Sequence, residues 1–227
     1  MSERPNPTSE AAGVRQAWGR VTAWLESNDP GVLAALGGPG DPAALAAAER
    51  RMGLELPDDV RQWLLAIDID AGSCPGGLGG VVPGGRLLLG LTDIERVHLH
   101  RMTLEETVPS GDPGHPHWRR ERLPIVAECD GLYGTFVDTR TGTVGTWSDG
   151  EFPEGGEHPS LSAFLQETAD RLEGVSTGDW NGPARARRLA PRPADDPVRH
   201  WARANGYLVN DRGRIPSAVR EAYEAAQ

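Results

Sequence analysis

Two arginines flank a glycine near the end of the chain, at Arg212, Gly213 and Arg214. A glycine has no side chain, so the backbone at that point can lie close to the floor of a narrow groove. The two flanking guanidinium groups can then diverge along the groove and donate hydrogen bonds. The minor groove of A·T-rich DNA is narrow, concentrates negative potential and offers only acceptors. The tripeptide is therefore a candidate minor-groove ligand. Because arginine is common in this chain, the tripeptide alone is weak evidence, and the surrounding sequence must support the assignment.

The charge of the chain is divided unevenly along its length. The 227 residues carry a formal net charge of −10, which by itself argues against a nucleic-acid partner. Residues 180–227, however, hold nine arginines and five acidic residues, whereas the first 179 residues hold 14 arginines and 28 acidic residues. A basic tail on an acidic body is the distribution expected of a protein that binds a polyanion at one end only. Every basic residue is an arginine, a bias typical of a G+C-rich genome.

A small module of two helices is expected around the tripeptide, over residues 196–227. Asp196 has the chemistry of an N-cap, Pro197 that of a first helical residue, and Asn205-Gly206 ends the segment. A loop follows over 207–215, and Pro216 begins the second helix. The core of the module is expected to come mainly from three aromatic side chains, Trp201, Tyr207 and Tyr223.

A longer string of residues surrounds the tripeptide. It comprises Val198 to Gly206, Val209, Asp211 to Pro216, Val219 and Ala222-Tyr223. This string, about thirty residues without a gap, resembles the DNA-binding domain of the actinobacterial Lsr-type nucleoid silencer, a functional analogue of H-NS. The resemblance implies a helix-loop-helix whose Arg-Gly-Arg prong enters the minor groove of A·T-rich DNA. The dimerisation domain of that silencer has no counterpart here.

The resemblance also implies which residues contact DNA. Arg212, Gly213 and Arg214 form the prong. The expected neighbours of phosphates or sugars are Arg199, Arg203, Asn210, Ser217 and Arg220.

The preceding segment, residues 176–195, has the Gly-, Pro-, Ala- and Arg-rich composition of a flexible linker. It contains a basic run of Arg185, Arg187, Arg188 and Arg192. Arginines in a linker are often merely solvated. Next to a DNA-binding module, we interpret these four as phosphate contacts.

Residues 13–175 show helix patterns first, then strand patterns, and then a closing helix. This order predicts an α+β domain with mixed helices and an antiparallel sheet rather than the alternation of a parallel sheet. Helices are expected to begin near Gly13, Asp41-Pro42, Leu56-Pro57, Thr92 and Ser160. Strands are expected over 86–91, 123–127, 132–137 and 143–147. Residues 1–12 are expected to be disordered, and the glycine-rich stretch 72–85 is interpreted as a flexible loop rather than a phosphate cradle.

Several motifs in this body resemble the SUKH superfamily, which includes the yeast Smi/Knr cell-wall regulators and many bacterial toxin-immunity proteins. In the opening motif, a helix bearing Ala48-Glu49 leads through Gly53 to Leu56-Pro57 and a second helix. The central strands and closing helix match over Leu123–Ala127, Gly134–Asp138, Gly142–Gly145 and Ser160–Gly174. The Asn-Gly that usually follows the second helix is replaced by Ile67 to Gly72. Because members are mostly binding scaffolds without catalytic machinery, the resemblance implies protein recognition.

Some side chains of the body are of types that bind metal ions in other proteins. They form two His-x-His pairs and two isolated cysteines, namely His98, His100, His115, His117, Cys74 and Cys129. No paired cysteine motif or His-Glu helix completes a site, so we expect neither a metal nor a cofactor. Asp68 and Asp70 are interpreted as a helix end rather than as an acid/base pair. Since no Gly-x-Ser-x-Gly elbow or Cys/His signature is visible, we expect a protein that is not an enzyme.

The sequence as a whole predicts a cytoplasmic DNA-binding adaptor of the nucleoid. No stretch approaches the ~20 consecutive apolar residues of a membrane span, the N-terminus lacks a signal-like hydrophobic segment, and two distant cysteines favour a reducing compartment. The expected partners are A·T-rich double-stranded DNA and, through residues 13–175, another protein or a second copy of the chain. The acidic surplus of the body fits either a solvated surface or a face for a basic partner.

The alternative hypothesis is a toxin-immunity or other protein-binding function. In that case the DNA-binding tail would only localise the protein.

Overall fold

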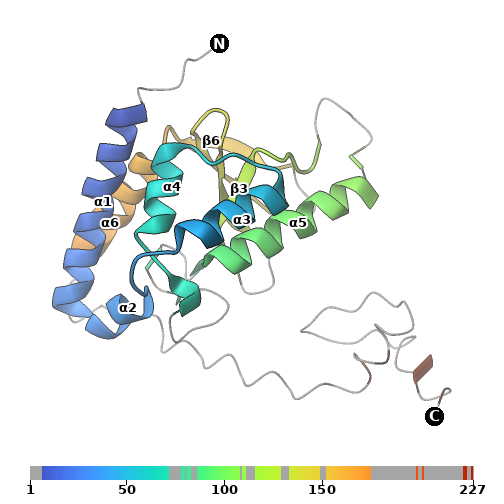
Figure 1. Ribbon diagram of the computed structural model, residues 1–227, viewed down its shortest axis with the longest axis horizontal. Coiled ribbons are helices and arrows are strands. Elements are labelled where there is room, and N and C mark those ends of the chain that lie inside the picture. Colours follow the sequence, from blue (N-terminus) through green and yellow to red (C-terminus); the bar gives the residue numbers. More distant parts are fainter. Residues whose placement is uncertain are drawn as a thin grey trace. The chain divides into compact units, whose positions relative to one another are not determined.

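The computed structural model describes most of the first 174 residues and five positions near the C-terminus. The described residues are 7–71, 78–79, 81–82, 86–107, 109–110, 116–128, 133–148 and 152–174, together with 198, 201, 222, 223 and 226. The chain divides into two compact units, residues 1–184 and residues 185–227. Figure 1 traces the first unit through its helices and its sheet.

The first unit is an α+β domain, as predicted. Its described elements are α1 (Pro7–Asn28), α2 (Pro30–Ala35), α3 (Pro42–Met52), α4 (Asp58–Leu65), the 3-10 helix η1 (Ile69–Ala71), β1 (Leu78–Gly79), β2 (Leu87–Leu88), α5 (Leu91–Thr107), β3 (Arg122–Ala127), β4 (Gly134–Asp138), β5 (Val144–Trp147), β6 (Glu154–His158) and α6 (Leu161–Gly174). The described strands form one antiparallel sheet in the order β1-β2-β3-β4-β5-β6. Since each strand pairs with the next along the chain, the sheet is a simple meander.

Helix α1 begins earlier than expected. We expected disorder over residues 1–12, and this is wrong for the described part, because residues 7–12 belong to α1. The buried side chain of Ala11 and the hydrogen bond from Ser162 Oγ to Glu10 Oε2, 3.2 Å long, anchor this first part of the helix. The sequence there is polar and rich in proline, so its helical state depends on contacts with α6, which a local pattern does not reveal.

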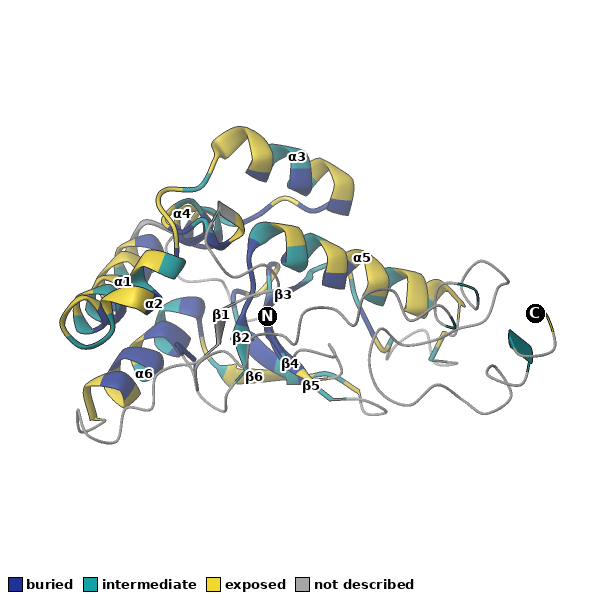
Figure 2. Cartoon of the chain, turned by 90° about the horizontal axis from the view of Figure 1, so that it is seen from below, coloured by how far each residue is buried: buried dark blue, intermediate teal, exposed yellow. Residues whose placement is uncertain are grey.

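The remainder of α1 packs between α4 and α6. The ring of Trp18 meets the ring of Trp63 on α4 edge to face, with centroids 5.9 Å apart. On the opposite side, Arg20 donates hydrogen bonds to Asp170 and Glu173 on α6, and these bonds raise the pKa of its guanidinium. Figure 2 shows α1 and α6 lying side by side with buried faces toward each other.

Helix α3 begins and ends with the residues that the sequence indicates. Asp41 Oδ1 accepts a hydrogen bond from the backbone N–H of Ala43 at 2.9 Å, and Pro42 occupies the first turn. Gly53 ends the helix with φ 63°, a left-handed conformation that glycine adopts without strain.

The turn from α3 to α4 is held by Glu49. Its Oε1 atom accepts a hydrogen bond from the backbone N–H of Leu56 at 2.8 Å and another from the Arg61 guanidinium at 2.7 Å. Ala48 and Leu56 are buried beside it. The motif that resembles the SUKH opening therefore stabilises the turn between two helices.

The central strands β3, β4 and β5 are almost entirely buried and agree with the predicted strands. Strand β6 was not predicted, because Glu154-Gly155-Gly156-Glu157-His158 lacks apolar alternation. It exists by pairing with β5, through Val144 with His158 and Thr146 with Glu154. Strand β1 and helix α2 were also not predicted. The former is a two-residue pairing inside the glycine-rich stretch, and the latter is one short helix capped by Asp29.

Trp118 lies between α5 and β3, outside any helix or strand, yet its side chain is buried. Its ring packs edge to face against Phe136 and Trp147, with centroids 5.7 and 5.4 Å away. The guanidinium carbon of Arg101, on α5, lies 5.8 Å from the centroid of the Trp118 ring and 5.4 Å from that of Trp147. This cation–π contact joins α5 to the sheet.

Replacing Glu49 with alanine is expected to destabilise the first unit by about 1–3 kcal/mol, because it leaves the Leu56 N–H and the Arg61 guanidinium without this acceptor. Denaturant unfolding of the full chain, followed by tryptophan fluorescence, measures the change. Glu26→Ala removes a carboxylate from an exposed helical position and should change stability by less than about 0.5 kcal/mol. Equal effects of the two substitutions would contradict the role assigned to Glu49.

Candidate functional site

In the C-terminal unit, the described residues include two of the three aromatic side chains expected in its core. The rings of Trp201 and Tyr223 meet edge to face, with centroids 5.6 Å apart and planes at 72°. These two side chains therefore contact each other, and their place in a core of the module stays a prediction. Tyr207 lies outside the described residues.

The predicted DNA contacts also lie outside the described residues. This holds for the prong (Arg212, Gly213, Arg214), its expected neighbours (Arg199, Arg203, Asn210, Ser217, Arg220) and the linker arginines (Arg185, Arg187, Arg188, Arg192). Their assignment therefore stays a prediction from sequence.

His98, on α5, is a buried structural residue. Its Nδ1 atom lies 3.1 Å from the carbonyl oxygen of Arg122. A carbonyl only accepts, so Nδ1 carries the proton and Nε2 is the unprotonated nitrogen of the neutral ring. Nε2 is buried and has no hydrogen-bond partner among the described residues. Burial lowers the pKa of His98, the Arg122 carbonyl opposes this, and the nearby charge of Arg120 lowers it further.

The other candidate metal ligands do not gather around His98. His100 lies at the surface of α5, where partial desolvation by neighbouring atoms, followed by the positive charges of Arg101 and Arg96, lowers its pKa. The ring of His117 stacks on Phe152 with a centroid distance of 4.8 Å. Within the described part of the chain, no group of three His, Cys, Asp or Glu side chains is arranged to hold a metal ion. His115, Cys74 and Cys129 lie outside that part.

Asp70 lies at the end of a helix, as interpreted from the sequence. That helix is α5, which begins only at Leu91. The Oδ2 atom of Asp70 accepts a hydrogen bond of 2.8 Å from the backbone N–H of Thr92, in the first turn of α5. Gly90 makes this approach possible, because a Cβ atom there would lie 2.3 Å from Asp70 Oδ1. Asp68, two residues earlier, donates its backbone N–H to the carbonyl of Leu36 at 3.0 Å.

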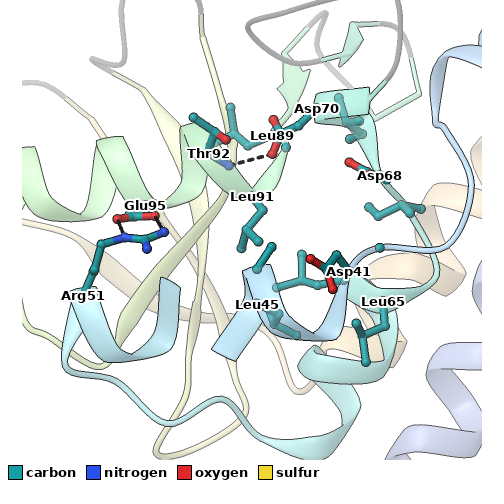
Figure 3. Close-up of a pocket in the computed structure, with 16 residues that line it drawn as sticks. Asp41, Leu45, Arg51, Leu65, Asp68, Asp70, Leu89, Leu91, Thr92 and Glu95 are labelled. Atoms are coloured by element: carbon teal, nitrogen blue, oxygen red, sulfur yellow. Dashed lines mark hydrogen bonds and ion pairs between the residues drawn. The ribbon is translucent and has the colours of Figure 1, made fainter. Parts of the chain in front are cut away.

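A cavity of about 240 Å³ opens between α3, the segment from α4 to η1, and the start of α5 (Figure 3). Its apolar lining includes Leu45, Leu64, Ile67, Ile69 and Leu89, which are buried. Its polar lining includes Asp41, Asp68, Asp70, Thr92, Glu95 and Arg51. The sequence alone did not reveal this cavity, because its walls come from separate segments between Gly40 and Glu95.

One ion pair lies at the side of the cavity. Arg51 on α3 binds Glu95 on α5 through two hydrogen bonds, Nε to Oε1 at 2.5 Å and a terminal nitrogen to Oε2 at 2.7 Å. These hydrogen bonds lower the pKa of Glu95 more than its partial burial raises it. Figure 3 shows this pair to one side of the opening that Asp41, Asp68 and Leu91 surround.

Each of the two units contains a match to a known protein family. Residues 39–167 match the SMI1/KNR4 family, SUKH-1. The chain belongs to this family. Residues 190–226 match the Lsr2 DNA-binding domain, so the chain joins an SMI1/KNR4 domain to a DNA-binding domain and has DNA as a partner.

The SMI1/KNR4 match begins at residue 39 and thus contains the whole cavity, whose lining runs from Gly40 to Glu95. Helix α1 precedes the match but contributes to the same hydrophobic core, through Val14, Ala17, Val21 and Leu25. In the described part of the chain, no helix is both long and apolar enough to cross a membrane.

The neutral state of His98 is expected to make stability depend on pH. Since its pKa in the folded chain lies below the ordinary value of 6.5, the unfolded chain binds the proton first as the pH falls. The free energy of unfolding should therefore decrease from about pH 6.5 downward, until the pH reaches the folded pKa.

Urea unfolding between pH 7.5 and 5.5 measures this dependence. His98→Gln should flatten it, whereas His117→Gln, at an exposed position, should leave it as in the unmodified protein. An unchanged pH dependence in His98→Gln would show that other groups cause it.

Proposed function

We propose that this protein is a non-enzymatic adaptor that binds the minor groove of A·T-rich DNA and acts in nucleoid association or in the silencing of foreign DNA. The observation that carries the proposal is the match of residues 190–226 to the Lsr2 DNA-binding domain. The packing of Trp201 against Tyr223 supports a folded module at this end of the chain. In a G+C-rich genome, A·T-rich DNA is a distinguishable target.

The proposed reader of the groove is the tripeptide Arg212-Gly213-Arg214. A narrow minor groove attracts arginine because its negative potential is strong and its floor presents acceptors. Glycine between the two arginines lets the backbone approach that floor without a side chain in the way. The prong thus selects groove width and acceptor pattern rather than an individual base sequence.

The acidic first unit is proposed to supply a protein contact rather than a DNA contact. The first 179 residues hold 28 acidic residues and 14 arginines, and this surplus repels phosphates. A single small module with a few arginines is expected to bind DNA with a Kd near ~10⁻⁴–10⁻⁶ M. Holding several modules together raises the overall affinity by about 10²–10⁴-fold. Self-association, or recruitment to a multivalent partner, through residues 13–175 would provide this gain.

The SMI1/KNR4 match favours one alternative, because it covers more than half of the chain. In this alternative the first unit binds and neutralises a toxin or another protein, and the DNA-binding domain only localises it. A gel shift that compares A·T-rich with G·C-rich duplexes separates the two, since only the adaptor requires a preference for A·T-rich DNA.

The double substitution Arg212→Ala/Arg214→Ala should weaken binding to an A·T-rich duplex and remove the preference over a G·C-rich duplex. Each lost groove contact is expected to cost on the order of 1–3 kcal/mol. Gly213→Val should be similarly harmful, since a branched side chain would stand between the prong and the groove floor. Fluorescence anisotropy with labelled duplexes measures both effects.

Arg140→Ala, an exposed arginine at the turn after β4, is the matched control and should retain the preference. An unchanged A·T preference in the double variant would contradict the assignment of the prong.

Replacement of Arg185, Arg187, Arg188 and Arg192 with glutamine tests the linker. If these residues contact phosphates, affinity should fall equally for A·T-rich and G·C-rich duplexes. The slope of log K against log salt should shrink by roughly 0.9 for each lost contact. A slope equal to that of the unmodified protein would show that the four arginines are merely solvated.

A further inference from the structure

We propose that the cavity between α3, η1 and α5 is a docking site for a basic segment of a partner protein, which inserts one arginine or lysine side chain. The inference rests on the proposed function, because it names the surface through which the first unit recognises a protein. It depends on three features of the cavity, namely its charge, the arrangement of polar and apolar walls, and its rigidity.

The lining of the cavity carries an excess of negative charge. It contains four carboxylates, Asp41, Asp68, Asp70 and Glu95, and one basic side chain, Arg51. Arg51 binds Glu95 through Nε and one of its two terminal nitrogens, so this pair is close to neutral as a unit. The lining as a whole has three more carboxylates than basic side chains, and this excess gives the opening a negative potential that attracts a cation.

Polar and apolar side chains occupy different depths of the cavity. Asp41 and Asp70 are exposed, and Asp68 is partly exposed, whereas five of the seven leucine and isoleucine side chains in the lining are buried. Arginine and lysine have the complementary arrangement, an aliphatic stem that packs on apolar surface and a charged end that stays near the rim. An acidic rim over an apolar floor is therefore better matched to a long basic side chain than to an anion or a neutral apolar ligand.

The backbone holds these walls together before any partner arrives. The N–H of Gly40 donates to the carbonyl of Leu65 at 3.0 Å, and a Cβ atom at Gly40 would lie 2.8 Å from the carbonyl oxygen of Leu64. The residues that lead into α3 are thus in close backbone contact with the C-terminal end of α4. Asp70 in turn is fixed to α5 by its hydrogen bond to Thr92. A preformed site loses less entropy on binding than a flexible one.

Two of the rim carboxylates are oriented by the helices that they cap. Asp41 accepts the N–H of Ala43, and Asp70 accepts the N–H of Thr92. A carboxylate has about four lone-pair positions, so a cap can also accept a hydrogen bond from an incoming cation. A multivalent partner that itself binds DNA is consistent with the proposed function, and such a protein displays lysine and arginine on its surface.

The test measures binding of a fluorescein-labelled nona-arginine peptide to the full chain by fluorescence anisotropy. The variant Asp41→Asn/Asp68→Asn/Asp70→Asn removes three charges while asparagine retains an oxygen that caps a helix. Its affinity for the peptide should be at least about tenfold lower than that of the unmodified protein. The control variant Glu26→Gln/Glu106→Gln/Glu157→Gln changes net charge equally at exposed positions outside the cavity and should bind nearly as well as the unmodified protein.

A second pair of variants tests the cavity itself rather than its charge. Ala44→Phe places a large ring in the lining and should weaken peptide binding, whereas Ala43→Phe, at an exposed neighbour outside the lining, should not. Circular dichroism and urea unfolding confirm that each variant is folded.

Equal loss of binding in both triple variants, or no effect of Ala44→Phe, would overturn the proposal in favour of a diffuse attraction to the acidic surface. A change in self-association of the aspartate variant without a change in peptide binding would make a second copy the occupant and would also overturn it. The preference for A·T-rich DNA is measured separately through Arg212 and Arg214. Failure of the docking site therefore leaves that result intact, and loss of the DNA preference leaves the peptide result intact.

Discussion

The carboxylate of Glu49 fixes the angle at which two helices leave a short turn. It accepts one hydrogen bond from the backbone of Leu56 and one from Arg61, so it ties α3 both to the connecting segment and to α4 itself. Those two helices supply one side of the cavity, through Leu45 on α3 and Leu64 on α4. A change in the position of either helix would alter the cavity, the contact of Gly40 with Leu65, and the pairing of Arg51 with Glu95 on α5.

Elements whose stability is local were predictable from the sequence, and elements that depend on distant partners were not. Asp41-Pro42 and Gly53 mark the ends of α3 because capping and left-handed turns involve neighbouring residues only. The first turns of α1 and the strand β6 are different, since their sequences resemble coil and their structure comes from pairing with α6 and β5.

The same distinction between local and distant determinants applies to the candidate sites. The Arg-Gly-Arg prong is a contiguous motif, which one sequence suffices to suggest. The cavity is assembled from three separated segments, and its key contact joins Asp70 to Thr92, 22 residues later. The spacing of Asp68 and Asp70 indicated a helix end without indicating that the helix was α5. No periodicity or motif in the sequence encodes that pairing.

Strand β6, at one edge of the described sheet, matters if several copies of the protein gather on one DNA tract, as the proposed function requires. At high local concentration, an exposed strand with unpaired backbone groups is a template for strand-to-strand pairing and aggregation. Strand β6 ends the described sheet, and it carries exposed Glu154 and Glu157 around Gly155 and Gly156, the latter with φ 83°. Like charges on two such edges repel each other, and the glycines weaken the strand as a template. The sequence of β6 therefore disfavours edge-to-edge pairing of this strand between crowded copies of the domain.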